Sequence, residues 1–158
     1  MNLALYADKK IGHSYNMNLM RKGIERKGCG LVAAYNAAIL AGVPTSYDNV
    51  SLQARAWCGF RNEGMKTAKM THLFRCLNVP TSRLKKGTPV NVALCALWEG
   101  HSVVFGYCDE TPGSGHAIVV TSDFKVLNGI GKFKKWTTLF NAICTGEVSF
   151  NAWIVGKP

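Results

Sequence analysis

Residues 28–38 read Gly28-Cys29-Gly30-Leu31-Val32-Ala33-Ala34-Tyr35-Asn36-Ala37-Ala38. One cysteine stands between two glycines, and an alanine-rich segment typical of a helix follows it. We expect this helix to run from about residue 30 to residue 41, because Gly42 and Val43-Pro44 are typical helix terminators. Its small side chains allow neighbours to pack closely on more than one side. A thiol at the start of such a helix feels the positive end of the helix dipole, which favours the thiolate.

The sequence after this helix predicts three more helices and then an antiparallel sheet. One helix is capped by Ser46 or Asp48, and the next is capped by Thr67 and carries an apolar stripe. The last has Thr88 as N-cap and Pro89 as its first residue, and runs to about Trp98. Strands are expected at 101–107, 116–121, 124–127 and 148–155, with a short strand at 2–6 and a short helix at 137–144. Helices followed by strands indicate an α+β fold, and we expect one domain over residues 1–158.

The composition excludes a disordered chain and suggests the kind of partner. The chain is 47% hydrophobic and 18% charged, which is typical of a globular protein. Its formal net charge of +10 favours acidic partners, namely an acidic protein or a nucleic acid. The basic residues are spread along the chain, however, and solvated surface explains most of them. No apolar run is long enough for a membrane span, so we expect none.

The six cysteines are widely spaced in the sequence and are expected to be buried free thiols. They are Cys29, Cys58, Cys76, Cys95, Cys108 and Cys144. They form no CxxC motif and show no His/Cys spacing typical of a metal site, so we expect neither metal ligands nor a cofactor. No signal peptide is recognisable before Asp8-Lys9-Lys10. Free thiols indicate a reducing, cytoplasmic compartment.

Cys29 and His116 together suggest a thiol hydrolase. Such an enzyme needs a thiolate, a base within hydrogen-bond reach and a third group that orients the base. His116 enters a predicted strand far downstream of Cys29. Asn128 lies almost symmetrically across the Ser122-Asp123 turn from His116, so a tight hairpin would place the two side by side. An asparagine carbonyl could then accept a proton from one imidazole nitrogen and leave the other facing the sulfur.

Other residues compete for each of these roles. Asp123 is a second candidate orienter, although the tip of a turn would direct it to solvent. His101 is a second candidate base, and His13 and His72 are weaker ones. Each residue also has a purely structural interpretation, since helix-start cysteines usually pack and Asn128-Gly129 can simply form a turn. We expect the tryptophans Trp57, Trp98 and Trp136 to lie in the core.

The chain resembles the papain-like cysteine peptidases over roughly residues 24–128. It is most similar to the bacteriocin-leader-processing branch of bacteria and phages. The segment from Cys29 to Ala37 resembles the cysteine helix of that branch, and Gly115-His116-Ala117-Ile118-Val119-Val120 resembles its histidine strand. The resemblance implies a papain-like α+β fold, in which an N-terminal helical half packs its nucleophile helix on a C-terminal antiparallel sheet. It implies Cys29 as nucleophile, His116 as base and Asn128 as orienter, with a protein or peptide as substrate. A phage virion or an infected host cell is then a further candidate location.

The segment before Cys29 departs from that family. The family usually has a glutamine there that donates to the oxyanion, and residues 18–28 contain none. Asn18, Asn16 or a basic side chain are the candidate substitutes, beside the Cys29 main-chain N–H. Loss of one such donor typically costs about 10²–10³ in rate.

Two functions from different classes remain open on the sequence. The first is a cysteine peptidase or isopeptidase acting through a thioester on Cys29, with acyl transfer to another acceptor as a variant. The second is a peptidase-like binding module, weak or inactive in catalysis, for an acidic protein or a nucleic acid.

Overall fold

The alanine-rich segment forms the central helix of the fold. The computed structural model describes residues 29–60, 67–108, 115–129 and 131–156. Helix α3 (Cys29–Leu40) is followed by α4 (Tyr47–Trp57), the 3-10 turn η2 (Thr67–Lys69) and α5 (Met70–Cys76). Most of α3 is buried, because β3 lies against it on one side and α4 and α5 pack on it from the other. Its small side chains permit this close packing, as expected. Gly42 ends the helical segment with a φ of 74°.

The second half of the described chain is mainly an antiparallel sheet with two helices. Its elements are β1 (Thr81–Arg83), α6 (Val90–Trp98), β2 (Val103–Cys108), β3 (His116–Val120), β4 (Val126–Leu127), η3 (Gly131–Lys134), α7 (Trp136–Cys144) and β5 (Ser149–Val155). The strand order is β1-β5-β2-β3-β4, with every neighbouring pair antiparallel. The fold is therefore α+β, as predicted.

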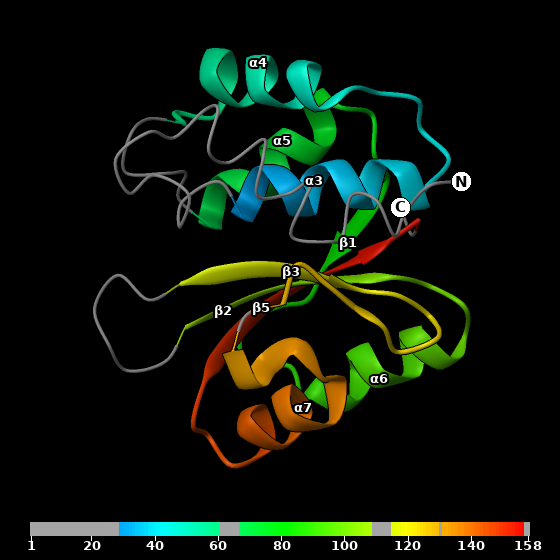
Figure 1. The fold of residues 1–158 in the computed structure, drawn as a ribbon, viewed down its shortest axis with the longest axis vertical. Coiled ribbons are helices and arrows are strands. Elements are labelled where there is room, and N and C mark those ends of the chain that lie inside the picture. The colour runs from blue at the N-terminus through cyan, green and yellow to red at the C-terminus, as the bar shows by residue number, and fades with distance from the viewer. Residues whose placement is uncertain (1–28, 61–66, 109–114, 130, 157–158) are drawn as a thin grey trace.

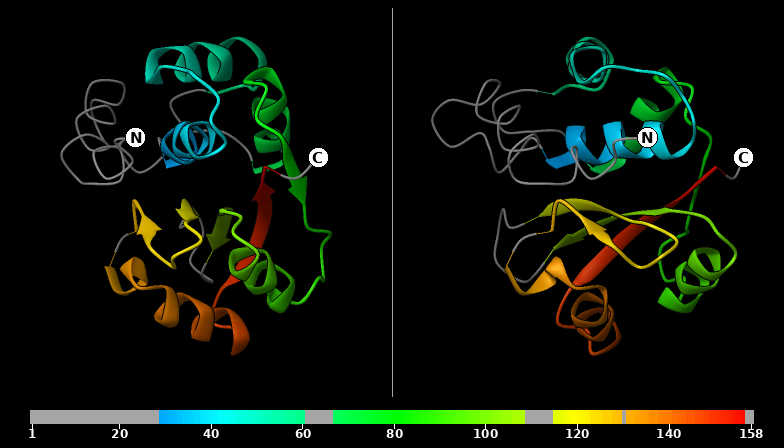
Figure 2. Two further views of the ribbon diagram at one scale, coloured as in Figure 1. Left: turned by 90° about the vertical axis from the view of Figure 1, so that its right-hand side faces the viewer. Right: turned by 45° about the vertical axis from the view of Figure 1, so that its right-hand side comes forward.

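The sheet separates two helical layers. Helices α3 and α5 lie on one side of the sheet with α4 stacked outside them, and α6 and α7 lie on the other side (Figure 1). The side views in Figure 2 show the same three layers. Residues alternate between the faces, so Val104, Val119 and Trp153 pack in the α3-side core, whereas Phe105 and Ile118 pack in the core under α6 and α7.

The structure confirms one of the expected helix caps and corrects others. Ser46 caps α4, accepting a hydrogen bond from the Asn49 N–H. Thr67 is not a cap, because it begins the 3-10 turn that leads into α5. The N-cap of α6 is Pro89, one residue later than expected. Strand β1 was not predicted, and the proposed strand at 2–6 lies outside the described residues.

Exposure also differs from the sequence expectation at two tryptophans and three cysteines. Trp57 and Trp98 are 63% and 73% exposed, whereas Trp136 is buried. Both exposed rings occupy the last residue of a helix, α4 and α6 respectively. All six cysteines are free thiols, but Cys95, Cys108 and Cys144 are exposed.

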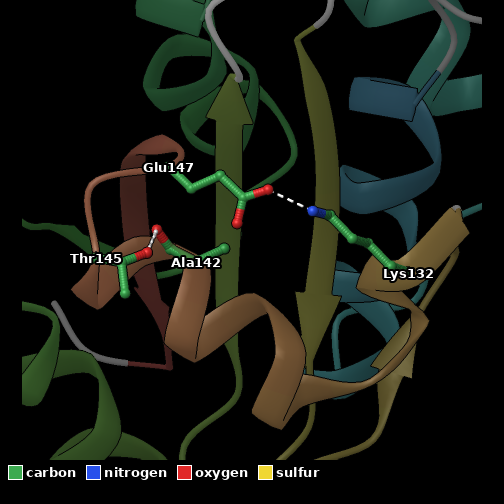
Figure 3. Close-up of polar contacts among 4 residues, drawn as sticks. All are labelled: Lys132, Ala142, Thr145 and Glu147. Carbon is green, nitrogen blue, oxygen red and sulfur yellow. Dashed lines mark hydrogen bonds and ion pairs between the residues drawn. The ribbon is translucent and has the colours of Figure 1, made fainter.

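Two polar contacts at the surface of the α7 region contribute little to its stability. Lys132 of η3 forms an ion pair with Glu147 in the loop after α7, and the Thr145 hydroxyl donates to the Ala142 carbonyl (Figure 3). Both charged side chains are about half exposed. An exposed pair of this kind contributes about 0–1 kcal/mol, so packing rather than charge stabilises this layer.

Candidate functional site

Cys29 is the first residue of α3 and lies against β3. Its side chain is buried, and its sulfur accepts main-chain hydrogen bonds from Ala117 on β3, from Gly30 and from its own N–H. Burial nevertheless raises the pKa of the Cys29 thiol, because desolvation outweighs these hydrogen bonds. The Cys29 sulfur thus contacts the sheet at Ala117, the residue that follows His116. Because its pKa is raised, the side chain is a neutral thiol before substrate binds.

His116 begins β3 and is directed away from α3. Ala117 and Val119 pack in the α3-side core, so alternation along the strand places His116 on the other face, with Ile118. Its ring meets the Tyr107 ring edge-on, with centroids 5.8 Å apart. Burial lowers the pKa of His116, although a hydrogen bond to Asn128 acts in the opposite direction.

The structure brings His116 and Asn128 together through the main chain. His116 Nε2 lies 2.7 Å from the Asn128 carbonyl oxygen. A carbonyl only accepts hydrogen bonds, so Nε2 carries the proton and Nδ1 keeps a free lone pair in the neutral ring. The acceptor belongs to the backbone rather than to the side-chain amide, which differs from the sequence expectation.

An extra residue in the hairpin turn explains this difference. The Thr121 N–H donates to the Lys125 carbonyl, so three residues, Ser122 to Phe124, form the turn. Phe124 adopts a φ of 64°, as the last residue of such turns does. The register Val119↔Leu127 therefore places Asn128 opposite Ile118, two residues from His116, the partner predicted for it. Asn128 itself has a φ of 64°, a conformation that asparagine tolerates well.

Cys29 and His116 are not joined by a hydrogen bond, although both lie among the described residues. Cys29 contacts the main chain next to the histidine, not the imidazole. The raised pKa of the Cys29 thiol and the lowered pKa of the His116 imidazole both favour the neutral pair, because burial penalises either charge. Proton transfer between them would therefore accompany substrate attack, not precede it.

The competing residues lie elsewhere. Asp123 is exposed and accepts a hydrogen bond from the Thr121 hydroxyl. His101 lies at the other end of the sheet, with Nδ1 3.2 Å from the Val155 carbonyl oxygen. The oxyanion candidates Asn16 and Asn18, like His13, lie outside the described residues.

A second group of reactive side chains was missed by the sequence analysis. Cys58, His72 and Cys76 bring their ligand atoms within 4.8 Å of one another. His72 and Cys76 are spaced i, i+4 on α5, which is a readable signal because such residues share a helix face. Cys58 follows α4, and only the packing of α4 on α5 brings it close.

Comparison with known proteins adds no relative. The chain matches no family model, no curated protein and no solved structure. Among the described residues, no helix combines the length and the apolar character that crossing a bilayer requires.

The buried imidazole makes a testable contribution to stability. Because the pKa of His116 is lower in the folded protein than its ordinary value of 6.5, the unfolded chain binds more protons. The free energy of unfolding should be highest above about pH 6.5 and fall as pH decreases through the folded-state pKa. Urea titrations of His116→Gln should lose part of this pH dependence. As a control, Ile118→Val on the same strand should lower the free energy of unfolding equally at pH 8 and pH 5. If the free energy of unfolding varied with pH equally in His116→Gln and wild type, His116 would not be the group responsible.

Proposed function

We propose that the protein is a papain-like cysteine peptidase or isopeptidase in which Cys29 is the nucleophile and His116 the base. The observation that carries the proposal is the Nε2–H bond from His116 to the Asn128 carbonyl. It holds the imidazole in the tautomer whose Nδ1 can accept a proton. Cys29 begins a helix beside the next residue of that strand.

The chemistry begins from a neutral thiol and a neutral imidazole. As Cys29 Sγ attacks the substrate carbonyl, its proton passes to His116 Nδ1, and a carbon–sulfur bond forms. The imidazolium then protonates the leaving amine as the carbon–nitrogen bond breaks, which leaves a thioester on Cys29. Water attacks the thioester with His116 again as base, and the acid product and the free thiol are released.

The start of α3 supplies donors for the oxyanion. The first N–H groups of a helix have no partners within it, and the helix dipole is positive at this end. The N–H groups of Cys29 and Gly30 already point at the sulfur. Asn128 would act as the orienter through its main chain. His116 and Cys29 lie on opposite faces of β3 in this resting state, so the His116 ring must leave the Asn128 carbonyl and turn around the edge of β3 to reach the sulfur when substrate binds.

A binding module without catalysis is the second candidate. The buried, neutral Cys29 and the absence of a hydrogen bond from it to His116, within the described structure, favour this function. The net charge of +10 suggests an acidic protein or a nucleic acid as its partner.

A peptide vinyl sulfone distinguishes the two functions at neutral pH. In a peptidase, Cys29 should react faster than the exposed Cys95 and Cys144, because His116 removes its proton as the carbon–sulfur bond forms. In a binding module, Cys29 should react more slowly than both, since burial raises its pKa. Peptide mass spectrometry measures the three rates in one sample.

The base requires its own variant. His116→Gln should lower the rate of Cys29 labelling by about 10²–10⁴ if the imidazole is the base. His101→Gln, which changes the competing histidine at the other end of the sheet, is the matched control and should label like wild type. Equal rates in all three proteins would remove His116 from the proposal.

A further inference from the structure

The Cys58, His72 and Cys76 side chains, which we call the α4–α5 cluster, converge from two helices. Cys58 is the C-cap residue of α4, whereas His72 and Cys76 lie one turn apart on α5. Their three ligand atoms lie within 4.8 Å of one another, and His72 Nε2 is 3.8 Å from Cys76 Sγ. The cluster is separate from Cys29 and His116 in sequence and lies in the helical layer on the α3 side of the sheet (Figure 1).

We infer that the α4–α5 cluster binds a zinc ion through Cys58 Sγ, His72 Nε2 and Cys76 Sγ. Two thiolates and an imidazole are the ligands that zinc prefers, and thiolates select it over harder cations. Tetrahedral bonds of the usual lengths would separate sulfur from nitrogen by about 3.6 Å and the two sulfurs by about 3.8 Å. The observed spacing therefore needs only small side-chain adjustments to close around the ion.

The three positions differ in exposure in a way that suits an open metal site. Cys58 is buried, Cys76 is half-buried and His72 is exposed. Cys58 would bind the ion from the buried side. The fourth coordination position would face solvent and take a water molecule. Burial and the neighbouring Cys76 raise the pKa of Cys58 to about 11, so zinc must displace protons to bind. Nearby Lys69 acts in the opposite direction and favours the thiolate.

Hydrophobic packing explains Cys58 alone but not the whole cluster. A buried free cysteine is an ordinary small apolar residue. His72 and Cys76 are not fully buried, yet their Nε2 and Sγ atoms meet beside the Cys58 sulfur. A bound ion would cross-link the end of α4 to α5, two helices that support α3. The inference is independent of catalysis at Cys29.

The test is a zinc titration of the reduced full-length chain against a chromophoric chelator. One zinc ion per chain should bind, and cobalt in place of zinc should give the absorption of a thiolate-to-cobalt charge transfer. His72→Ala and Cys76→Ser should each weaken binding by at least about tenfold, because each removes a ligand. Neither side chain is fully buried, so both variants should fold, which circular dichroism verifies.

Exposed cysteines outside the cluster serve as matched controls. Cys95→Ser and Cys144→Ser should bind zinc like wild type. Absence of binding at equimolar zinc, or equal binding by Cys76→Ser and wild type, would overturn the inference. A Cys58–Cys76 disulfide that forms in air and persists with excess zinc and without reductant would overturn it as well, in favour of a redox pair.

Discussion

Trp153→Ala should lower the free energy of unfolding by about 3–5 kcal/mol. Trp153 lies on β5 between Arg83 of β1 and Val104 of β2, and only 1% of its surface is exposed. Its ring meets the edge of Phe74 on α5, with centroids 6.0 Å apart. Its indole N–H donates to the Thr71 hydroxyl at 2.9 Å. Alanine would leave a cavity between the sheet and α5 and an unpaired hydroxyl.

Chemical denaturation with matched variants separates these contributions. Trp98→Ala, which removes a ring that is 73% exposed, should change stability by no more than about 0.5 kcal/mol. Trp153→Phe keeps most of the ring but loses the indole donor. Its cost should lie between those of the two alanine variants. A loss below about 1 kcal/mol for Trp153→Ala would show that the sheet and α5 do not depend on this contact.

Gly129→Ala should displace the backbone that holds His116 and cost several kcal/mol of stability. A β-carbon at Gly129 would lie 2.8 Å from the Phe133 carbonyl oxygen and 2.9 Å from the α-carbon of Lys134. Both atoms belong to the main chain, so the segment after β4 must move. Overpacking typically costs about 1–3 kcal/mol, and here the shift also moves the adjacent Asn128 carbonyl.

Gly106→Ala on β2 is the matched control for this substitution. A β-carbon there would meet only side chains, at 3.7 Å and 3.8 Å, which are ordinary contacts. This variant should be as stable as wild type or slightly more so. In the NMR spectrum of Gly129→Ala, the His116 Nε2–H should lose its hydrogen-bond shift. If both variants unfold alike and the His116 signal persists, the tight approach at Gly129 has no role in the site.

The helices were readable from the sequence because their signals are local. The stripe of Met70, Leu73 and Phe74 and the stop at Gly42 depend only on residues a few positions apart. Strand β1 carries no such signal. Its three residues, Thr81–Arg83, become a strand only because β5, far along the chain, pairs with them. Long-range pairing of this kind cannot be read from a short window.

The proximity of His116 and Asn128 was predicted from the sequence, but the geometry of their contact was not. The sequence suggested that His116 and Asn128 are neighbours, and their hydrogen bond shows that they are. It missed the three-residue turn, because an aromatic residue such as Phe124 rarely adopts a positive φ. The roles of Cys29, His116 and Asn128 in catalysis stay a prediction.

The α4–α5 cluster shows a different limit of sequence reasoning. His72 and Cys76 could have been recognised from their i, i+4 spacing on a predicted helix. Cys58 could not, because its approach depends on how α4 packs on α5. A spacing rule confined to one short segment therefore overlooks ligand sets that two helices share.

The position of β5 in the sheet has a consequence for biosynthesis. This strand is the last of the described strands in the sequence, yet it lies between β1 and β2. Ribosomes add about 5–20 residues per second, and until residues 149–155 emerge, β1 has no partner among the described strands and β2 pairs only with β3 among them. A nascent chain stalled before this point would expose strand edges that can pair with other chains. The sheet against which α3 packs is therefore complete only after this strand has been synthesised.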